Sequence, residues 1–322
     1  MAAVVPLLIH RPTGAAAPLV FDSPHSGMEY PPDFAPAASR EQIATTWDAH
    51  VDALYRGVTE AGAVLLAATF PRAYLDANRA ADDIDQELLD APWPEPVALS
   101  DHARRGMGLI RRYVLPGVPM YRRRLSVGEV RRRIDDFHRP YRDALRREID
   151  AAAARHGHVW HFNCHSMKSR GNAMNTDSGR ARPDLVIGDR DGTSSDPAVT
   201  RWVAAHFSGL GYRVQVNDPY RGADIVRTHG DPTRGRCSVQ IEINRALYMD
   251  EVRRQSDHDA AVLAQKIVED AERDGDRIHG LLLVTTGNPV VIGAGVDRHR
   301  VAHHPRCHRV GQADVNRAHR PG

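Results

Sequence analysis

The sequence predicts an α/β fold with a mixed, mostly parallel central sheet and helices on both faces. Short apolar runs of strand length alternate with longer helical patterns between about residues 19 and 273, and this alternation is typical of parallel strands joined by helical crossovers. Polar and basic residues follow several of the apolar runs, as in "VWHFNCHSMKSRGN", residues 159–172. In such folds the ligand site usually lies where the strands end.

The first third of the chain supplies two of these apolar runs. Leu19–Asp22 reads as a strand followed by a turn, and residues 45–62 have helical spacing. Residues 63–79 contain two apolar runs split by Pro71, which predicts either two strands or a strand and a bent connection. Residues 80–120 show little periodicity and are expected to form a loop. A long irregular insertion in a compact domain usually serves a site.

The clearest helical signal covers residues 126–157. Ser126 and Glu129 match a capping box, and Gly157 matches a helix end. Pro140 should kink or split this helix. The remaining elements expected are a strand at 159–163, a loop at 169–197, a helix at 197–208, a strand at 212–216, a loop at 217–236, a strand at 237–248 and a helix at about 256–273.

The elements suggest one domain, residues 18–286, after a lead-in of residues 1–17. Residues 287–322 are basic and aperiodic, which is typical of a disordered tail. The N-terminus lacks the charged start of a signal peptide, and no segment offers the roughly eighteen apolar residues of a membrane helix. We therefore expect a cytoplasmic protein without a membrane partner.

Composition argues against two further classes. The three cysteines have no CxxC spacing, which disfavours a disulfide framework or a zinc knuckle. The formal net charge is only +2, and acidic residues interleave with the arginines of the helix at 126–157. A solvated helix face explains that pattern better than nucleic-acid binding does, so no nucleic-acid partner is expected.

Four polar clusters lie at predicted strand ends and could carry chemistry. They contain His25, the "LDANR" stretch of residues 75–79, His165 and Glu242. Taken alone, His165 could be a metal ligand, a catalytic base or a hydrogen-bonded core histidine. Glu242 alternates with apolar neighbours in a strand, and a carboxylate in a strand covered on both faces needs a partner or a function.

These residue types are the ones that a zinc hydrolase uses. Zinc takes imidazole and carboxylate ligands, usually three from the protein, and leaves one position for water. A nearby carboxylate can accept the proton of that water, and an asparagine–arginine pair can bind a substrate carboxylate.

The chain resembles the N-formylglutamate amidohydrolase family. The matching stretches run in order from about residue 18 to about residue 270, and they are "FDSPHSG", "WDAHVDALY", "YLDANR", "HRPYRDAL", "NCHSMKS", "PDLVIGDRDGTS", "NDPYRGADIVRTHGDP" and "SVQIEINRALYMDE". The family looks related to the zinc carboxypeptidases and to the aspartoacylase and succinylglutamate desuccinylase group. That resemblance implies a zinc-exopeptidase-like, phosphorylase/hydrolase-like α/β domain with one zinc ion.

The resemblance also implies roles for individual residues. It makes His25 the first metal ligand and His165 the last. The family relatives usually carry a glutamate three residues after the first histidine, where this chain has Met28. The second ligand is therefore expected to be Asp48, with Glu29 and His50 as alternatives.

The remaining roles concern substrate and catalysis. The resemblance implies that Asn78 and Arg79 bind a substrate carboxylate and that Glu242 is the general base. It also suggests that Arg221, Arg227 and His229, which lie in a Gly-rich loop, line the pocket; the alternative is a solvated cationic loop. Arg227 is one candidate for the cation that stabilises the oxyanion.

The expected function is therefore hydrolysis of the amide of a small, acidic N-acyl amino acid. The leading substrate is N-formyl-L-glutamate, cleaved to formate and L-glutamate by zinc-activated water. The alternatives are a zinc amidohydrolase or carboxypeptidase acting on another acyl-amino acid or a small peptide and, less favoured, a basic nucleic-acid-binding protein. The oligomeric state stays open.

Overall fold

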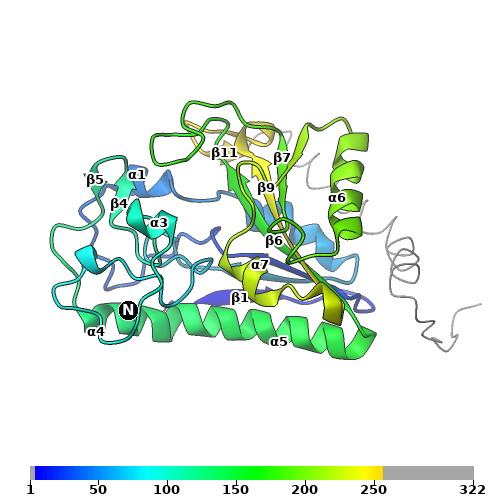
Figure 1. Ribbon diagram of the computed structural model, residues 1–322, viewed down its shortest axis with the longest axis horizontal. Helices are drawn as coiled ribbons and strands as arrows, with labels where there is room; N and C mark the ends of the chain where they lie inside the picture. The colour runs from blue at the N-terminus through cyan, green and yellow to red at the C-terminus, as the bar shows by residue number, and fades with distance from the viewer. Residues whose placement is uncertain (1–3, 257–322) are drawn as a thin grey trace, which may run out of the picture. The chain divides into compact units, whose positions relative to one another are not determined.

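A seven-stranded mixed sheet forms the centre of the computed structural model, which describes residues 4–256 (Figure 1). The strands lie in the order β1 (Leu7–His10), β3 (Val64–Ala68), β2 (Leu19–Ser23), β6 (Val159–Met167), β9 (Arg236–Asn244), β7 (Leu185–Gly188) and β8 (Val214–Val216). The four inner strands β3, β2, β6 and β9 are parallel, whereas β1 and β7 run antiparallel to their inner neighbours. The predicted mixed, mostly parallel sheet is confirmed.

Helices cover both faces of this sheet, as predicted. On one face, α5 (Arg139–His156) places Tyr141 against Asp22 of β2, with 2.8 Å from the hydroxyl to the carboxylate. On the other face, α6 (Pro197–Gly209) packs Trp202 against Trp160 of β6. Buried apolar residues of α5 and the sheet join one core, which includes Tyr141, Leu145, Ile149, Val20 and Leu66.

The long predicted helix is three consecutive segments rather than one helix. The chain runs through α4 (Val127–Arg133), a π-helical turn (Ile134–His138) and then α5. Pro140 lies in the first turn of α5, where its missing N–H costs least. The expected ends are present, since Ser126 and Glu129 form the capping box and Gly157 has a φ of 78°.

Several elements differ from the predictions. The expected helix at 45–62 is only α2 (Val51–Leu54) followed by a 3₁₀ turn, Arg56–Thr59. The expected loop at 169–197 contains β7, and the expected loop at 217–236 contains α7 (Asp224–His229). Both elements are too short to show a period in the sequence. The apolar runs around Pro71 form β3 and a bent connection.

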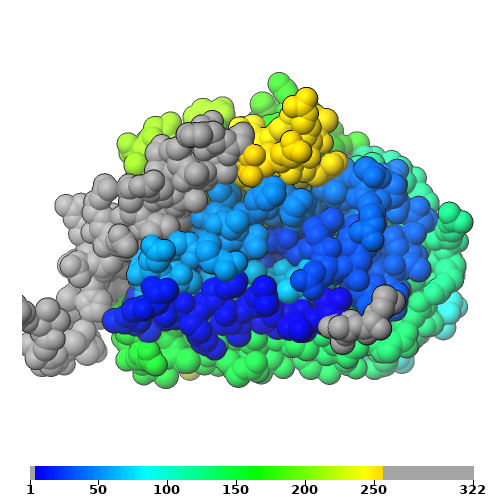
Figure 2. All heavy atoms as spheres, turned by 180° about the vertical axis from the view of Figure 1, so that it is seen from behind, coloured from blue at the N-terminus to red at the C-terminus, as the bar shows by residue number. Residues whose placement is uncertain are grey.

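The N-terminal segment also differs, because residues expected to be a lead-in form the edge strand β1. Pro6 and Pro12 flank this strand, and proline is tolerated at a sheet edge. Figure 2 shows this segment, in dark blue, at the surface beside α5, where Arg11 pairs with Glu148 at 2.6 Å.

The region at 80–120 carries more order than expected. It contains a 3₁₀ turn, Gln86–Leu88, and α3 (Asp101–Arg104), and it ends in a hairpin of β4 (Tyr113–Leu115) and β5 (Val118–Pro119). The other elements are α1 (Arg40–Ala44), 3₁₀ turns at Pro232–Arg234 and Arg245–Leu247, and a hairpin of β10 (Met249–Asp250) and β11 (Gln255–Ser256).

All the described residues belong to one compact unit. The predicted helix at 256–273 (apart from residue 256) and the predicted tail at 287–322 lie outside the described residues. Among residues 4–256, no helix has the length and apolar character needed to cross a membrane.

Candidate active site

One face of the two central strands is a buried row of polar side chains. On β6 these are His161, Asn163 and His165. The parallel register places them opposite Ser238, Gln240 and Glu242 of β9. A polar row inside a covered sheet must be satisfied by its own hydrogen bonds. The predicted strand at 159–163 extends to Met167, so His165 lies within the strand rather than after it.

Three side chains from distant parts of the chain meet at the C-terminal end of this row. His25 follows β2, Asp48 precedes α2, and His165 comes from β6. The Nδ1 atoms of the two histidines are 3.0 Å apart. The Oδ2 atom of Asp48 lies 3.3 Å from Nδ1 of His25 and 3.1 Å from Nδ1 of His165. All three side chains are buried, and their ligand atoms lie close enough together to hold a metal ion. We refer to His25, Asp48 and His165 as the candidate metal-binding group.

The other nitrogen of each ring is held by a buried acceptor. Nε2 of His25 lies 2.7 Å from Oδ1 of Asp76, and Nε2 of His165 lies 2.7 Å from Oδ1 of Asn163. Burial alone would raise the pKa of Asp76, but the charge of Arg72 holds that pKa well below its ordinary value. The Asp76 carboxylate is therefore ionised and accepts a hydrogen bond from the Nε2–H of His25.

Nε2 of His165 has contacts of both kinds. It lies 2.7 Å from the Asn163 oxygen, an acceptor, and 3.0 Å from the Asn78 amide nitrogen, a donor, so these contacts orient the ring without fixing its tautomer. The unprotonated Nδ1 of His25 faces the Asp48 carboxylate together with Nδ1 of His165. A lone pair on His25 beside a buried carboxylate is unfavourable by itself, and a cation between them removes that repulsion.

The donor set fits zinc. Two imidazole nitrogens and a carboxylate oxygen are ligands of catalytic zinc sites, which leave a further position open. Ligand atoms at about 2.0–2.2 Å from a tetrahedral ion lie roughly 3.3–3.5 Å from one another. The observed 3.0–3.3 Å separations are close to this spacing. Buried acceptors that orient the ligating histidines are a usual companion of such sites.

Asp48 is held in place by arginines on its far oxygen. Oδ1 accepts from Nη2 of Arg245 at 3.0 Å and lies 3.6 Å from Nη1 of Arg72. These two guanidinium groups stabilise the ionised form of Asp48. Oδ2 stays charged and free to face the histidines.

The two alternative second ligands lie elsewhere. Glu29 is exposed. His50 donates through Nε2 to the carbonyl of Arg254, 3.1 Å away. Neither belongs to the group formed by His25, Asp48 and His165.

Glu242 is a buried carboxylate directly across the strand pair from His165. Within residues 4–256 its hydrogen bond comes from the Gln240 amide at 2.9 Å. Arg245, a natural partner for a purely structural role, binds Asp48 and Ser166 instead. Burial raises the pKa of Glu242, the charge of His165 lowers it, and the charge of Asp48 raises it again, with a net increase.

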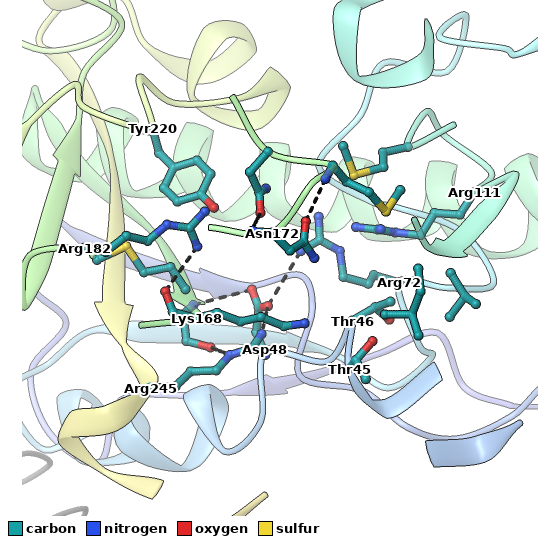
Figure 3. Close-up of a pocket in the computed structure, with 17 residues that line it drawn as sticks. Thr45, Thr46, Asp48, Arg72, Arg111, Lys168, Asn172, Arg182, Tyr220 and Arg245 are labelled. Carbon is teal, nitrogen blue, oxygen red and sulfur yellow. Dashed lines mark hydrogen bonds and ion pairs between the residues drawn. The ribbon is translucent and has the colours of Figure 1, made fainter. Parts of the chain in front are cut away.

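A pocket opens beside Asp48 (Figure 3). Its charged lining consists of one carboxylate, Asp48, and five basic side chains, which are Arg72, Arg111, Lys168, Arg182 and Arg245. Figure 3 shows Arg72 and Arg111 reaching in from one side, and Arg182 with Tyr220 from the other. Such an excess of positive charge suits an anionic small molecule.

Asn78 and Arg79 lie next to the metal-binding group, outside the lining of this pocket. The Asn78 amide lies 3.0 Å from Nε2 of His165 and 3.1 Å from Oδ1 of Asn163, and its oxygen accepts from the backbone of Ile225. Arg79 donates to the carbonyl of Met107 at 3.3 Å and lies 4.0 Å from Asp76.

Arg221, Arg227 and His229, the three residues expected to line the pocket from the Gly-rich loop, lie outside the pocket lining. Arg221 is exposed and pairs with Asp191, and Arg227 is exposed and pairs with Asp224. His229 is buried on α7 with its ring against His161, 6.0 Å between centroids. None of the three lines the pocket at Asp48.

The sequence reasoning did not single out most of the pocket cations. Arg72 directly follows Pro71 between two apolar runs, and Arg111 lies in the region at 80–120 that was expected to be a loop. Lys168 and Arg245 were visible beside His165 and Glu242, as basic residues next to two candidate site residues.

Comparison with known proteins decides the family. A family model described as N-formylglutamate amidohydrolase matches residues 17–249. The chain belongs to the N-formylglutamate amidohydrolase family. The resemblance noted from the sequence motifs is thus confirmed, and the chain is a hydrolytic enzyme of this N-formylglutamate amidohydrolase kind, which acts on an amide other than a peptide bond.

Relatives of this family support the assignment. The N-formylglutamate deformylase of Pseudomonas putida is 29% identical over 240 residues, 73% of this chain and 82% of that protein. The N-formylglutamate deformylase of Pseudomonas aeruginosa is 29% identical over 238 residues, 73% of this chain and 83% of that protein.

Solved structures show the same N-formylglutamate amidohydrolase fold. The crystal structure of N-formylglutamate amidohydrolase from Ralstonia eutropha JMP134 has a TM-score of 0.82 at 42% identity, covering 86% of this chain and 99% of that chain. A gene product of Agrobacterium tumefaciens shares the fold, with a TM-score of 0.59 at 19% identity over 85% of this chain and 96% of that chain.

Proposed function

We propose that the enzyme hydrolyses N-formyl-L-glutamate to formate and L-glutamate, with one zinc ion held by His25, Asp48 and His165. The observation that carries the proposal is the convergence of three buried potential ligand atoms, all within 4.8 Å of one another, at the edge of a cationic pocket. The family and the names of the Pseudomonas relatives support the substrate.

When bound, zinc supplies a Lewis acid and lowers the pKa of a water molecule toward neutrality. The protein's own residues then have three tasks, which are to hold the ligands, to move one proton and to bind the acidic substrate. The ligands are already oriented by Asp76, Asn163 and Arg245 through the contacts described above.

Glu242 is proposed to move the proton. It takes a proton from the attacking water as the water oxygen bonds to the formyl carbon. It gives that proton to the departing nitrogen as the C–N bond breaks, which leaves formate and the free amine. Its buried carboxylate has a raised pKa and no arginine partner among residues 4–256, both of which suit a base.

Binding of the acidic substrate is assigned to the pocket cations. Arg72 and Arg245 contact Asp48 and so lie nearest to the reacting amide. They are placed to stabilise the oxyanion and the adjacent α-carboxylate. The roles expected for Asn78, Arg79, Arg221, His229 and Arg227 stay predictions, because these residues lie outside the pocket lining.

Two measurements on the purified protein test the proposal. Metal analysis should find about one zinc per chain, and a formate assay should show release from N-formyl-L-glutamate that stops after chelation and returns with zinc. Faster hydrolysis of an N-acetyl amino acid or a dipeptide would redirect the proposal to another substrate. A metal-free, fully active enzyme would remove the zinc mechanism.

A further inference from the structure

Arg111 is a buried cation with no partner in the part of the chain that the structure describes. Its side chain is 8% exposed and lines the pocket beside Asp48. No hydrogen bond or ion pair joins its guanidinium to any of residues 4–256, and its Nε atom is buried without an acceptor. An unpaired charge in such a place is costly, so proteins usually neutralise or pair it.

The neighbours of Arg111 add positive charge instead of neutralising it. Burial and the charge of Arg72 lower the pKa of Arg111 to about 9. Lys168, also in the pocket lining, has no partner for its ammonium group among the described residues. Burial and then the charge of Arg245 lower the Lys168 pKa to about 8, and Arg111 contributes to that decrease.

The other three pocket cations are already paired. Arg72 binds Asp76 at 2.7 Å, Arg245 binds Asp48 at 3.0 Å, and Arg182 binds Asp177 through two contacts of 2.7 and 2.9 Å. Arg111 and Lys168 are therefore the two of these five basic side chains that have no carboxylate partner of their own among residues 4–256.

We propose that Arg111, assisted by Lys168, binds the side-chain carboxylate of the acyl-amino acid and selects dicarboxylate substrates over neutral ones. This inference rests on the proposed function. The α-carboxylate is one carbon from the amide nitrogen and falls beside Arg72 and Arg245, which contact Asp48. Arg111 contacts none of the three metal-binding side chains, so it suits the more distant carboxylate.

The position of Arg111 in the chain gives it a rigid base. It lies between Met107, with which its backbone forms a bridge, and the hairpin of β4 and β5. The long insertion at 80–120 thus delivers a specificity residue to a pocket whose opposite side carries Arg182 and Tyr220 (Figure 3). A planar guanidinium can bind a carboxylate through two parallel hydrogen bonds.

The test compares N-formyl-L-glutamate with N-formyl-L-glutamine, which has the same length and a neutral side chain. The wild-type enzyme should prefer the glutamate compound in kcat/KM. In Arg111→Met this preference should fall on the order of a hundredfold, as for loss of a charge-assisted bidentate contact. The preference of Arg111→Lys should lie between those of wild type and Arg111→Met, since lysine keeps the charge and cannot form two parallel hydrogen bonds. An unchanged preference in both variants overturns the proposal.

Arg112 is a matched control, because it is the adjacent arginine and lies outside the pocket lining. It pairs with Asp85 at 2.9 Å and with Glu87, and it lies over the ring of Tyr113. Arg112→Met should lower the melting temperature and leave the glutamate preference as in wild type. Arg111→Met should keep or raise the melting temperature. If Arg111→Met instead melts lower than Arg112→Met and keeps the preference, Arg111 is a structural residue.

A binding measurement separates this proposal from the proposed function. Glutarate carries two carboxylates at the same spacing and has no amide to cleave. If wild type releases no formate yet binds glutarate, and Arg111→Met loses that binding, the carboxylate subsite stands and the hydrolysis does not. If wild type cleaves N-formyl-L-glutamate and the preference is unaffected by Arg111, only the subsite fails. If wild type neither cleaves the substrate nor binds glutarate, both fail.

Discussion

Nε2 of His25 lies 2.7 Å from Oδ1 of Asp76, and this contact directs Nδ1 of the same ring toward Asp48. Asp76 is fully buried, and Arg72 holds its other oxygen at 2.7 Å. The carboxylate therefore sets both the tautomer and the orientation of a proposed metal ligand without facing the metal-binding group itself.

Asp76→Asn should weaken zinc binding by about 10- to 100-fold, the usual cost of removing a group that orients a ligating histidine. Competition against a chelator of known affinity measures the change. Asp83→Asn is the control, because Asp83 is also buried but binds Ser100 through two contacts of 2.7 Å. Equal zinc affinity in wild type and Asp76→Asn would argue against this role.

The identity of the second ligand can be settled by three alanine variants. Asp48→Ala should lose most of the zinc and the activity, since its Oδ2 faces both Nδ1 atoms. Glu29→Ala and His50→Ala should retain zinc, because these side chains lie outside the group. Zinc per folded chain, measured after gel filtration, decides the matter. Loss of zinc in Glu29→Ala with retention in Asp48→Ala would reverse the assignment.

Glu242→Gln should keep zinc and the melting temperature while kcat falls by about 10²–10⁴, the usual contribution of a general base. The amide keeps the size and can still hydrogen-bond to Gln240, but it cannot accept the proton. A stable, zinc-loaded Glu242→Gln with wild-type kcat would exclude Glu242 as the base.

The pH profile gives a second test of Glu242. A base must be deprotonated, so kcat should fall as the pH drops through the Glu242 pKa. Burial raises that pKa above the ordinary value of 4.5, so the acid limb should lie above pH 4.5. The residual activity of Glu242→Gln should lack this limb, whereas a limb of unchanged position would assign the titration to another group.

The buried His229 should make the free energy of unfolding depend on pH. Burial, followed by the charge of His161, lowers the His229 pKa to about 3, whereas an unfolded histidine titrates near about 6.5. The unfolded chain therefore binds a proton that the folded chain does not. The contribution of His229 is fully present above pH 6.5 and is lost as the pH falls toward 3, by about 1.4 kcal/mol per pH unit.

Replacing His229 by phenylalanine should remove this loss. Between pH 7.5 and 5 the free energy of unfolding of His229→Phe should fall by about 2 kcal/mol less than that of wild type. Urea titrations at the two pH values measure the difference. At pH 8 the imidazole is neutral in both states, so the comparison there isolates packing. Parallel pH dependences would mean that His229 titrates normally in the folded protein.

The sequence predicted the parts of the fold that have a local signal. The capping box at Ser126 and Glu129 and the strand at Leu19–Asp22 depend on neighbouring residues, and both are present. β7 and α7 have four and six residues. A short buried element is decided by the sheet it packs on, so local periodicity cannot indicate it.

The same distinction holds for the site. His25, Asp48 and His165 were expected as ligands and the structure brings them together, but the sequence motifs supplied no reason for their geometry. For His25 that reason is long-range, because Asp76 orients its ring from 51 residues further along the chain, whereas Asn163 orients His165 from within the same strand. Arg111 looks like any other arginine until its burial and its missing partner are known.

The alternation of polar and apolar side chains along β6 and β9 also favours the native register of these two strands. His161, Asn163 and His165 share one face, while Trp160 and its apolar neighbours occupy the other. A slip of one residue would turn every side chain to the opposite face. Buried amides and imidazoles would then meet apolar partners, and Trp160 would displace the polar row. A chain with this misregister would therefore lose both the hydrogen bonds of the polar row and the apolar packing of Trp160. The hydrogen bonds that orient the proposed ligands therefore also favour the native register of β6 and β9.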